Sequence, residues 1–223
     1  MKKLKLIDLF LLRRKHNEVD MKNSDKIILD LCGGTGAWSR PYVEAGYDVR
    51  LITLPEQDVR LYQPPDNVYG ILAAPPCTEF AISGVRWWKS KPQRLLDDAL
   101  KTVYACQNII KIADPKFWAL ENPVGRLIHY IGKWRYNFQP YEYGDPWTKR
   151  TCIWGEHNIP VKNPVKPVGL WTGGTPSGKL GIVDHLEYLP PDWVHKLPPS
   201  KDRQMLRSIT PPGFAKAFFK ANP

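Results

Sequence analysis

Several features that define other classes of protein are missing from this sequence of 223 residues. The apolar run at residues 4–12 is interrupted by Lys5 and Asp8, and it is too short to cross a bilayer. No small-residue cleavage site follows it, and the chain has no internal repeat and no low-complexity tract. We therefore expect a cytoplasmic protein with no membrane partner.

Cysteine is also scarce, with four residues in the whole chain. No two of them have the close spacing of a zinc site, so we predict no metal centre and a reduced setting. Cys106 and Cys152 lie in apolar patterns that are typical of buried, structural thiols. Cys77 differs, because it follows Pro75 and Pro76 at the end of an apolar run.

Acidic residues are the minority charge, since 22 Asp and Glu against 32 Lys and Arg leave a formal net charge of +10. Such a balance favours a polyanionic partner, and nucleic acid before others. Three clusters, at residues 86–89, 133–136 and 147–150, set Trp or Tyr beside Lys or Arg. This pattern suits phosphate contacts and base stacking, although core aromatics with solvated neighbours explain any single cluster equally well.

Apolar runs at residues 27–31, 48–54, 68–74 and 116–120 predict strands. Helical patterns at residues 37–45 and 92–113 alternate with them, which predicts an α/β fold with a mainly parallel sheet. Shorter β segments are expected at residues 137–143 and 148–154. The sequence divides into a basic arm (residues 1–25), a main domain (26–156), an insert rich in Pro and Gly (157–200) and a closing helical segment (201–223).

Three motifs whose residues could bind a ligand or react with it each lie at the end of an apolar run. They are the glycine turn after Asp30, the Pro-Pro-Cys stretch ending at Cys77, and Glu121-Asn122-Pro123. Ligands of open α/β sheets collect at the carboxyl ends of the strands, and glycine lets the backbone approach them closely. We therefore expect the three motifs to share one site.

Cys77 and Glu121 are the candidate reactive groups. A thiol on a rigid turn serves as a nucleophile when positive charge lowers its pKa, and Arg86, Lys89 and Lys149 are candidates for that charge. A carboxyl group at the end of an apolar strand is partly desolvated, so its raised pKa would let it donate a proton near neutral pH. The alternatives are a structural cysteine and a surface-paired acid.

The order of these motifs resembles that of the DNA cytosine-C5 methyltransferases. The resemblance runs from Lys26 to the C-terminus and rests on Asp30 to Gly36, on Pro75-Pro76-Cys77 and on Glu121-Asn122-Pro123. Tyr143-Gly144-Asp145-Pro146 is similar to the family's Gly-x-Pro-Gln stretch, and residues 207–215 are similar to its closing Gly-Asn-x-Val-Pro-Pro-x-x-Ala segment.

The resemblance implies a Rossmann-like S-adenosylmethionine-dependent fold, with residues 26–156 catalytic and residues 157–200 a small target-recognition insert. It also implies double-stranded DNA with a flipped-out cytosine as substrate. Cys77 would add to C6 of cytosine, and Glu121 would hold and protonate N3. The implied cofactor contacts are Asp30, Cys32, Gly34, Gly36, Glu56, Asp58 and Pro75, and the implied DNA contacts are Arg86, Lys149 and Arg150.

The chain departs from the family pattern at several positions, with Cys32 in place of an aromatic residue, Trp147 in place of a glutamine, and Thr151 and Ser208 in place of an arginine and an asparagine. These changes suggest a compact, divergent monomer from a bacterium or a phage-infected cell. Three other hypotheses stay open: an amino-methyltransferase acting on N4 or N6, a binding protein without turnover, and the same thiol chemistry on a nucleotide or with a modified cofactor. Amino-methyltransferases normally carry an aromatic residue at the position of Cys77.

Overall fold

The computed structural model describes residues 21–166, 170–172, 187–189, 192–200 and 202–223. Its centre is a six-stranded sheet in the order β2-β1-β3-β4-β6-β5. These strands are β1 Ile27–Leu31, β2 Asp48–Ile52, β3 Val68–Ala73, β4 Phe117–Pro123, β5 Tyr136–Phe138 and β6 Thr151–Glu156. The first four positions in the order are parallel, whereas β6 is antiparallel to both β4 and β5.

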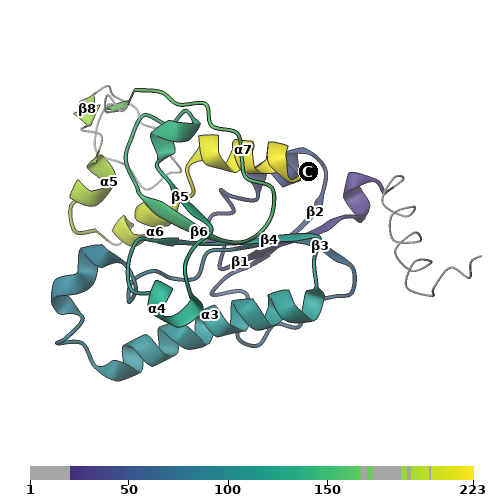
Figure 1. Ribbon diagram of the computed structural model, residues 1–223, viewed down its shortest axis with the longest axis horizontal. Helices are drawn as coiled ribbons and strands as arrows, with labels where there is room; N and C mark the ends of the chain where they lie inside the picture. The colour runs from purple at the N-terminus through teal and green to yellow at the C-terminus, as the bar shows by residue number, and fades with distance from the viewer. Residues whose placement is uncertain (1–20, 167–169, 173–186, 190–191, 201) are drawn as a thin grey trace, which may run out of the picture.

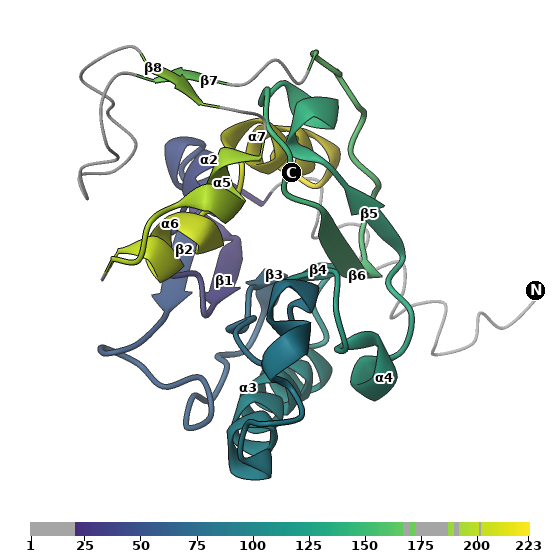
Figure 2. The ribbon, with the colours of Figure 1, turned by 90° about the vertical axis from the view of Figure 1, so that its left-hand side faces the viewer.

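Helices cover both faces of this sheet. In Figure 1, α3 (Gln93–Ala113) lies along one face and α7 (Pro212–Ala221) along the other. Figure 2 shows α4 (Ile128–Ile131) on the side of α3, with α2 (Arg40–Glu44), α5 (Trp193–Lys196) and α6 (Arg203–Ser208) on the side of α7. The short 3₁₀ segments are η1 Asn23–Asp25, η2 Ile82–Trp87 and η3 Pro140–Tyr143.

The strand order makes this a doubly wound, Rossmann-like sheet, as expected. β1 lies inside the sheet, with β2 at the edge on one side of it and β3 on the other. The reversal of strand order at β1 creates a topological switch point at the carboxyl ends of β1 and β3, where such folds bind ligands. β1 and β3 are almost fully buried, so their sequences are continuous apolar runs, and these runs predicted both strands.

Each face of the sheet has its own apolar core. On the α3 side, Leu100, Val103 and Cys106 pack with Leu29 and Ile71. The opposite core is aromatic and brings α7 onto the sheet, with the Phe138 and Phe214 rings stacked at 3.8 Å between centroids. These two cores fix the strand ends from both sides.

Some element boundaries differ from the predicted ones. β4 continues through Glu121 to Pro123 because β6 pairs with it there, at Ile153, Cys152 and Thr151. The first helix begins only at Arg40, since residues 33–39 form turns in which Gly34 and Gly36 have positive φ angles. Residues 139–143 are not a strand, because Pro140 starts η3.

The outer segments are described only in part. Most of the predicted arm, residues 1–20, and much of the predicted insert lie outside the described residues. Within the insert, Leu170–Thr172 (β7) and Glu187–Leu189 (β8) form an antiparallel pair. In the described part of the chain, no helix is both long and apolar enough to span a bilayer.

Candidate active site

A cavity of about 380 Å³ lies at the carboxyl ends of β1, β3 and β4. The three predicted motifs all line it, through residues of the glycine turn, the Pro-Pro-Cys stretch and the end of β4. Its volume is in the range of small-molecule sites. Of the residues expected from the sequence, it contains Asp30, Cys32, Gly34, Pro75, Cys77, Glu121, Lys149 and Arg150.

One end of the cavity is built by Asp30 and the glycine turn. Asp30 is fully buried, and the Ser39 hydroxyl donates a 2.5 Å hydrogen bond to its Oδ2. A Cβ at Gly33 would lie 2.3 Å from this carboxylate, so only glycine fits there. Burial raises the pKa of Asp30 to about 6, and the Ser39 hydrogen bond opposes that rise. Its other oxygen, Oδ1, has no hydrogen-bond partner within the described structure.

These features fit the methionine end of S-adenosylmethionine, which carries an ammonium and a sulfonium cation beside a carboxylate. The unpaired Oδ1 of Asp30 is an acceptor for such a cation. Gly33, Gly34 and Thr35 bring backbone to the same cavity. The residues present are therefore compatible with this cofactor.

Glu56, Asp58 and Gly36 lie outside this cavity. Glu56 is exposed and lines a second hollow past the end of β2, together with Leu51 and Tyr62. Gly36 lies nearby, since a Cβ built on it would be 3.9 Å from Leu51.

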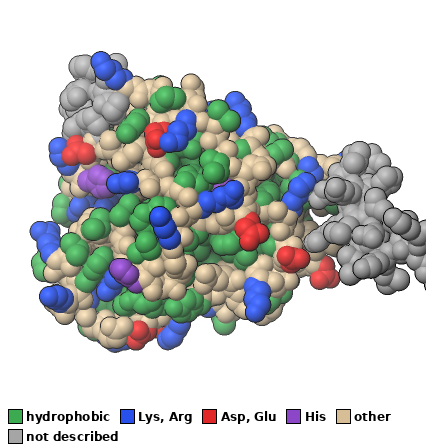
Figure 3. Space-filling view, viewed as in Figure 1, with side chains coloured by type: hydrophobic (Ala, Val, Ile, Leu, Met, Phe, Trp, Pro, Cys, Tyr) green, Lys and Arg blue, Asp and Glu red, His purple; other side chains and the backbone are tan. Residues whose placement is uncertain are grey.

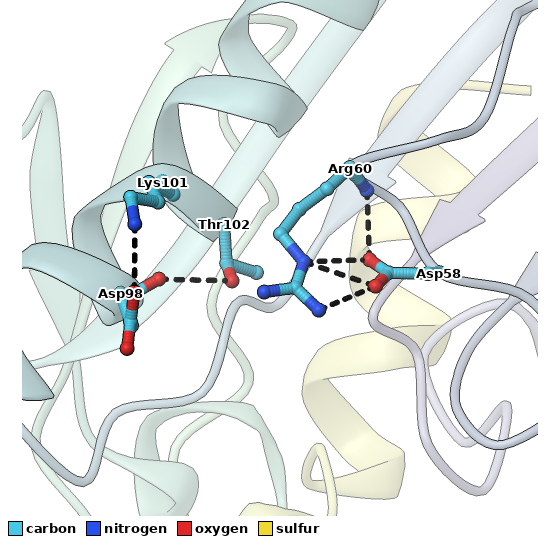
Figure 4. Close-up of polar contacts among 5 residues, drawn as sticks. All are labelled: Asp58, Arg60, Asp98, Lys101 and Thr102. Carbon is cyan, nitrogen blue, oxygen red and sulfur yellow. Dashed lines mark hydrogen bonds and ion pairs between the residues drawn. The ribbon is translucent and has the colours of Figure 1, made fainter.

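The Asp58 carboxylate is already occupied. It accepts hydrogen bonds from the backbone and the guanidinium of Arg60, close to the start of α3 (Figure 4). Arg60 lowers the pKa of Asp58 to about 2. Of these two expected cofactor contacts, only Glu56 lines a hollow and has no hydrogen bond or ion pair with another described residue.

The opposite end of the cavity holds Cys77 on a turn that is pinned by hydrogen bonds. The buried Asn122 side chain donates from Nδ2 to the Pro75 carbonyl at 2.9 Å. The amides of Phe80 and Ala81 both donate to the Cys77 carbonyl at 2.9 Å. The thiol is thus held beside β4, and Glu121 and Asn122 of β4 act on the same turn.

Cys77, Glu121 and Lys149 form an electrostatic group. Burial raises the pKa of Glu121, and Lys149 opposes that rise. The pKa of Cys77 is also raised, first by burial and then by the Glu121 carboxylate, while Lys149 and Arg207 lower it. Of the cations that the sequence suggested as lowering this pKa, Lys149 does so, whereas Arg86 and Lys89 are not among the causes of the shift. In the free protein the thiol is therefore protonated at neutral pH.

Lys149 and Arg150 enter the site from the segment just before β6. Lys149 is buried, and its Nζ donates to the Ile209 carbonyl at 3.1 Å. Arg150 is exposed and donates from Nε to Asn137 at 3.0 Å. Lys149 is thereby fixed beside the reactive groups, whereas Arg150 faces solvent.

The rim of the cavity includes η2, and Ile82 and Ser83 line the opening. Arg86 is exposed at this rim, with its guanidinium 5.1 Å from the Trp87 ring centroid, but it does not line the cavity. Glu79, before η2, and Lys91, after it, form an ion pair of 2.6 Å. This ion pair joins the two ends of the rim segment 79–91.

Sequence reasoning missed the contribution of the chain after residue 190. Val194, His195, Arg207, Ser208 and Thr210 all line the cavity. Only the packing of α5 and α6 over the strand ends brings them there. The one signal was the resemblance of residues 207–215 to the family's closing segment, in which Arg207 occupies a glycine position.

Asp145, in the stretch that resembles Gly-x-Pro-Gln, supports the start of α7. Its Oδ2 accepts a 2.8 Å hydrogen bond from the Gly213 amide, and burial raises its pKa to about 6. A Cβ at Gly213 would lie 2.0 Å from the Tyr143 carbonyl. This contact positions the segment that carries Arg207 to Thr210.

No protein-family model and no curated protein sequence matches the chain. The solved structures that match the chain include one described as a candidate DNA modification methyltransferase encoded within a prophage (E. coli). It is 16% identical to this chain with a TM-score of 0.45, over 63% of this chain. The match spans 53% of that protein, about half of its length.

Proposed function

We propose that this protein transfers a methyl group from S-adenosylmethionine to C5 of cytosine in DNA. The observation that carries the proposal is one cavity with Cys77 and Glu121 at one end and Asp30 with the glycine turn at the other. A thiol and a proton-donating carboxyl group suit attack on a pyrimidine ring. A buried carboxylate beside a glycine turn suits a cationic cofactor.

In the proposed reaction the Cys77 sulfur forms a bond to C6 of a flipped-out cytosine. Glu121 holds N3 and protonates it, which draws electrons from the ring and favours addition at C6. C5 thereby becomes nucleophilic, and bound S-adenosylmethionine supplies the methyl group that it accepts. Loss of the C5 proton and cleavage of the sulfur–C6 bond restore the aromatic ring and the free thiol.

The raised pKa of Glu121 supports its role as the proton donor, because the carboxyl group then keeps its proton closer to neutral pH. Its protonation also removes the negative charge that raises the pKa of Cys77. Lys149 and Arg207 remain as the cations that stabilise the thiolate. Protonation of Glu121 should therefore make the Cys77 thiol easier to ionise and so more reactive.

Charge supports DNA as the substrate. The chain carries a net charge of +10, and Lys and Arg side chains are spread over the face seen in Figure 3. Such a distribution favours sequence-independent attraction to phosphates. Arg150 and Arg86, exposed at the site and its rim, are the proposed DNA contacts.

The direct test uses tritium-labelled S-adenosylmethionine, unmethylated double-stranded DNA and nucleoside analysis of the product. The proposal expects label in 5-methylcytosine. Label in N4-methylcytosine or N6-methyladenine would replace it with the amino-methyltransferase hypothesis. No label, with cofactor still bound, would favour a binding protein or a modified cofactor.

A further inference from the structure

Arg207 is a charged residue of the cavity to which the proposed reaction assigns no substrate contact. It lies on α6, is partly buried, and lines the same cavity as Cys77 and Glu121. Its Nη2 makes a long hydrogen bond of 3.3 Å to the Ser83 hydroxyl. No carboxylate of the described residues forms an ion pair with it.

A partly buried guanidinium with no carboxylate partner among the described residues keeps its charge available for an anionic ligand. Guanidinium groups bind phosphate through paired, charge-assisted hydrogen bonds. Any cytosine that reaches Cys77 by leaving a DNA strand brings its own phosphate group to the mouth of this cavity. Arg207 lies at this mouth, so its positive charge is complementary to the negative charge of the phosphate.

The contacts of α6 strengthen this argument. Gln204 donates to Thr78, next to the reactive cysteine, at 3.3 Å, while Arg207 reaches Ser83 on η2. The helix thus links the Cys77 turn to the rim. A phosphate held by Arg207 would lie between these two segments and beside the thiol.

We propose that Arg207 binds the phosphate group of the target nucleotide and so holds the cytosine ring against Cys77. This inference rests on the proposed function, because it names the part of the substrate that the same site grips. The ligand chemistry is a nucleoside 5′-phosphate, either free or within a DNA strand. Arg207 is here a substrate-binding residue.

The test measures protection of Cys77 from iodoacetamide, followed by peptide mass spectrometry, in the presence of 2′-deoxycytidine or its 5′-monophosphate. In the wild-type protein we expect the monophosphate to protect at a concentration at least about tenfold lower than the nucleoside. Arg207→Gln should abolish this difference, and Arg207→Lys should retain part of it. Because the assay needs no turnover and no knowledge of the target sequence, it stands apart from the methylation assay.

A control variant separates the loss of Arg207 from a general loss of positive charge. Arg94→Gln removes an exposed arginine on α3 and should keep the preference for the monophosphate. A preference that persists in Arg207→Gln, or is absent from the wild-type protein, would overturn the inference.

The same measurement distinguishes this inference from the proposed function. If phosphate protection depends on Arg207 but no methyl group reaches cytosine in DNA, the inference stands and the proposed reaction fails. If cytosine is methylated but protection ignores the phosphate, the reaction stands and the role of Arg207 fails. A short DNA strand as competitor then shows whether the polymer binds more tightly than the free nucleotide.

Discussion

The two ends of the cavity are constructed in different ways. The end with Asp30 comes from one continuous segment, residues 27–39, in which a buried strand, a glycine turn and Ser39 follow one another. The end with Cys77 is assembled from β4, from α6 and from the segments that follow β3 and precede β6, which lie far apart in the sequence. The first end is thus a local structure, whereas the second exists only when the whole sheet has formed.

The acids at the two ends show the same contrast. Asp30 is held by a hydroxyl nine residues away, and its pKa is raised to about 6. The Glu121 carboxyl is opposed by Lys149, which comes from the segment just before β6. Changes at the Cys77 end should therefore affect chemistry, and changes at the Asp30 end should affect cofactor binding.

The largest expected effect is that of Cys77→Ser. We expect methyl transfer to fall by at least about 10⁴-fold, because the nucleophile is lost, while S-adenosylmethionine still binds. Calorimetric cofactor binding and the tritium assay measure the two parts. As the matched variant at the other end, Cys32→Ala should change the KM for the cofactor and still transfer methyl groups. Transfer by Cys77→Ser at the wild-type rate would contradict the thiol mechanism.

Glu121→Gln should have the next largest effect. The amide cannot supply a proton to N3, so we expect kcat to fall by about 10²- to 10⁴-fold. Glu156→Gln, at the exposed far end of β6, is the control and should keep wild-type kcat. Equal activity in Glu121→Gln and wild type would remove the proton-donor role.

A change in Asn122 tests whether β4 holds the Cys77 turn. Asn122→Ala leaves the buried Pro75 carbonyl without its donor, which should cost about 1–3 kcal/mol in the free energy of unfolding. Urea unfolding measures this loss, and Asn108→Ala, exposed on α3, is the control. If the two variants were equally stable, the hydrogen bond to Pro75 would not be a support of the turn.

The smallest expected effect is a shift in pH dependence at the Asp30 end. Asp30 becomes ionised as pH rises through about 6, so affinity for the cationic cofactor should rise over that range. Ser39→Ala removes a hydrogen bond that lowers the Asp30 pKa, and the rise in affinity should then move to higher pH. Cofactor titrations at several pH values measure this, with Ser90→Ala as control. An unchanged or lower midpoint would contradict the role given to Asp30.

The difference between the two ends also explains what the sequence could predict. The parallel sheet, the strand ends and the three motifs were readable, because buried strands and glycine turns leave local patterns. Arg207 and His195 had no such pattern, since only tertiary packing brings them to the cavity. The sequence named Lys149 as a cation that lowers the pKa of Cys77, but it could not show that burial and the Glu121 carboxylate outweigh that effect.

The central claim is a covalent bond between Cys77 and C6 of cytosine. Duplex DNA that contains 5-fluoro-2′-deoxycytidine tests it directly, because fluorine at C5 blocks the loss of the proton that would release the enzyme. After incubation with S-adenosylmethionine, the account predicts a denaturation-resistant complex in which the Cys77 peptide carries the methylated nucleotide. Methylation of ordinary DNA without any such adduct, or an adduct on another cysteine, would contradict it.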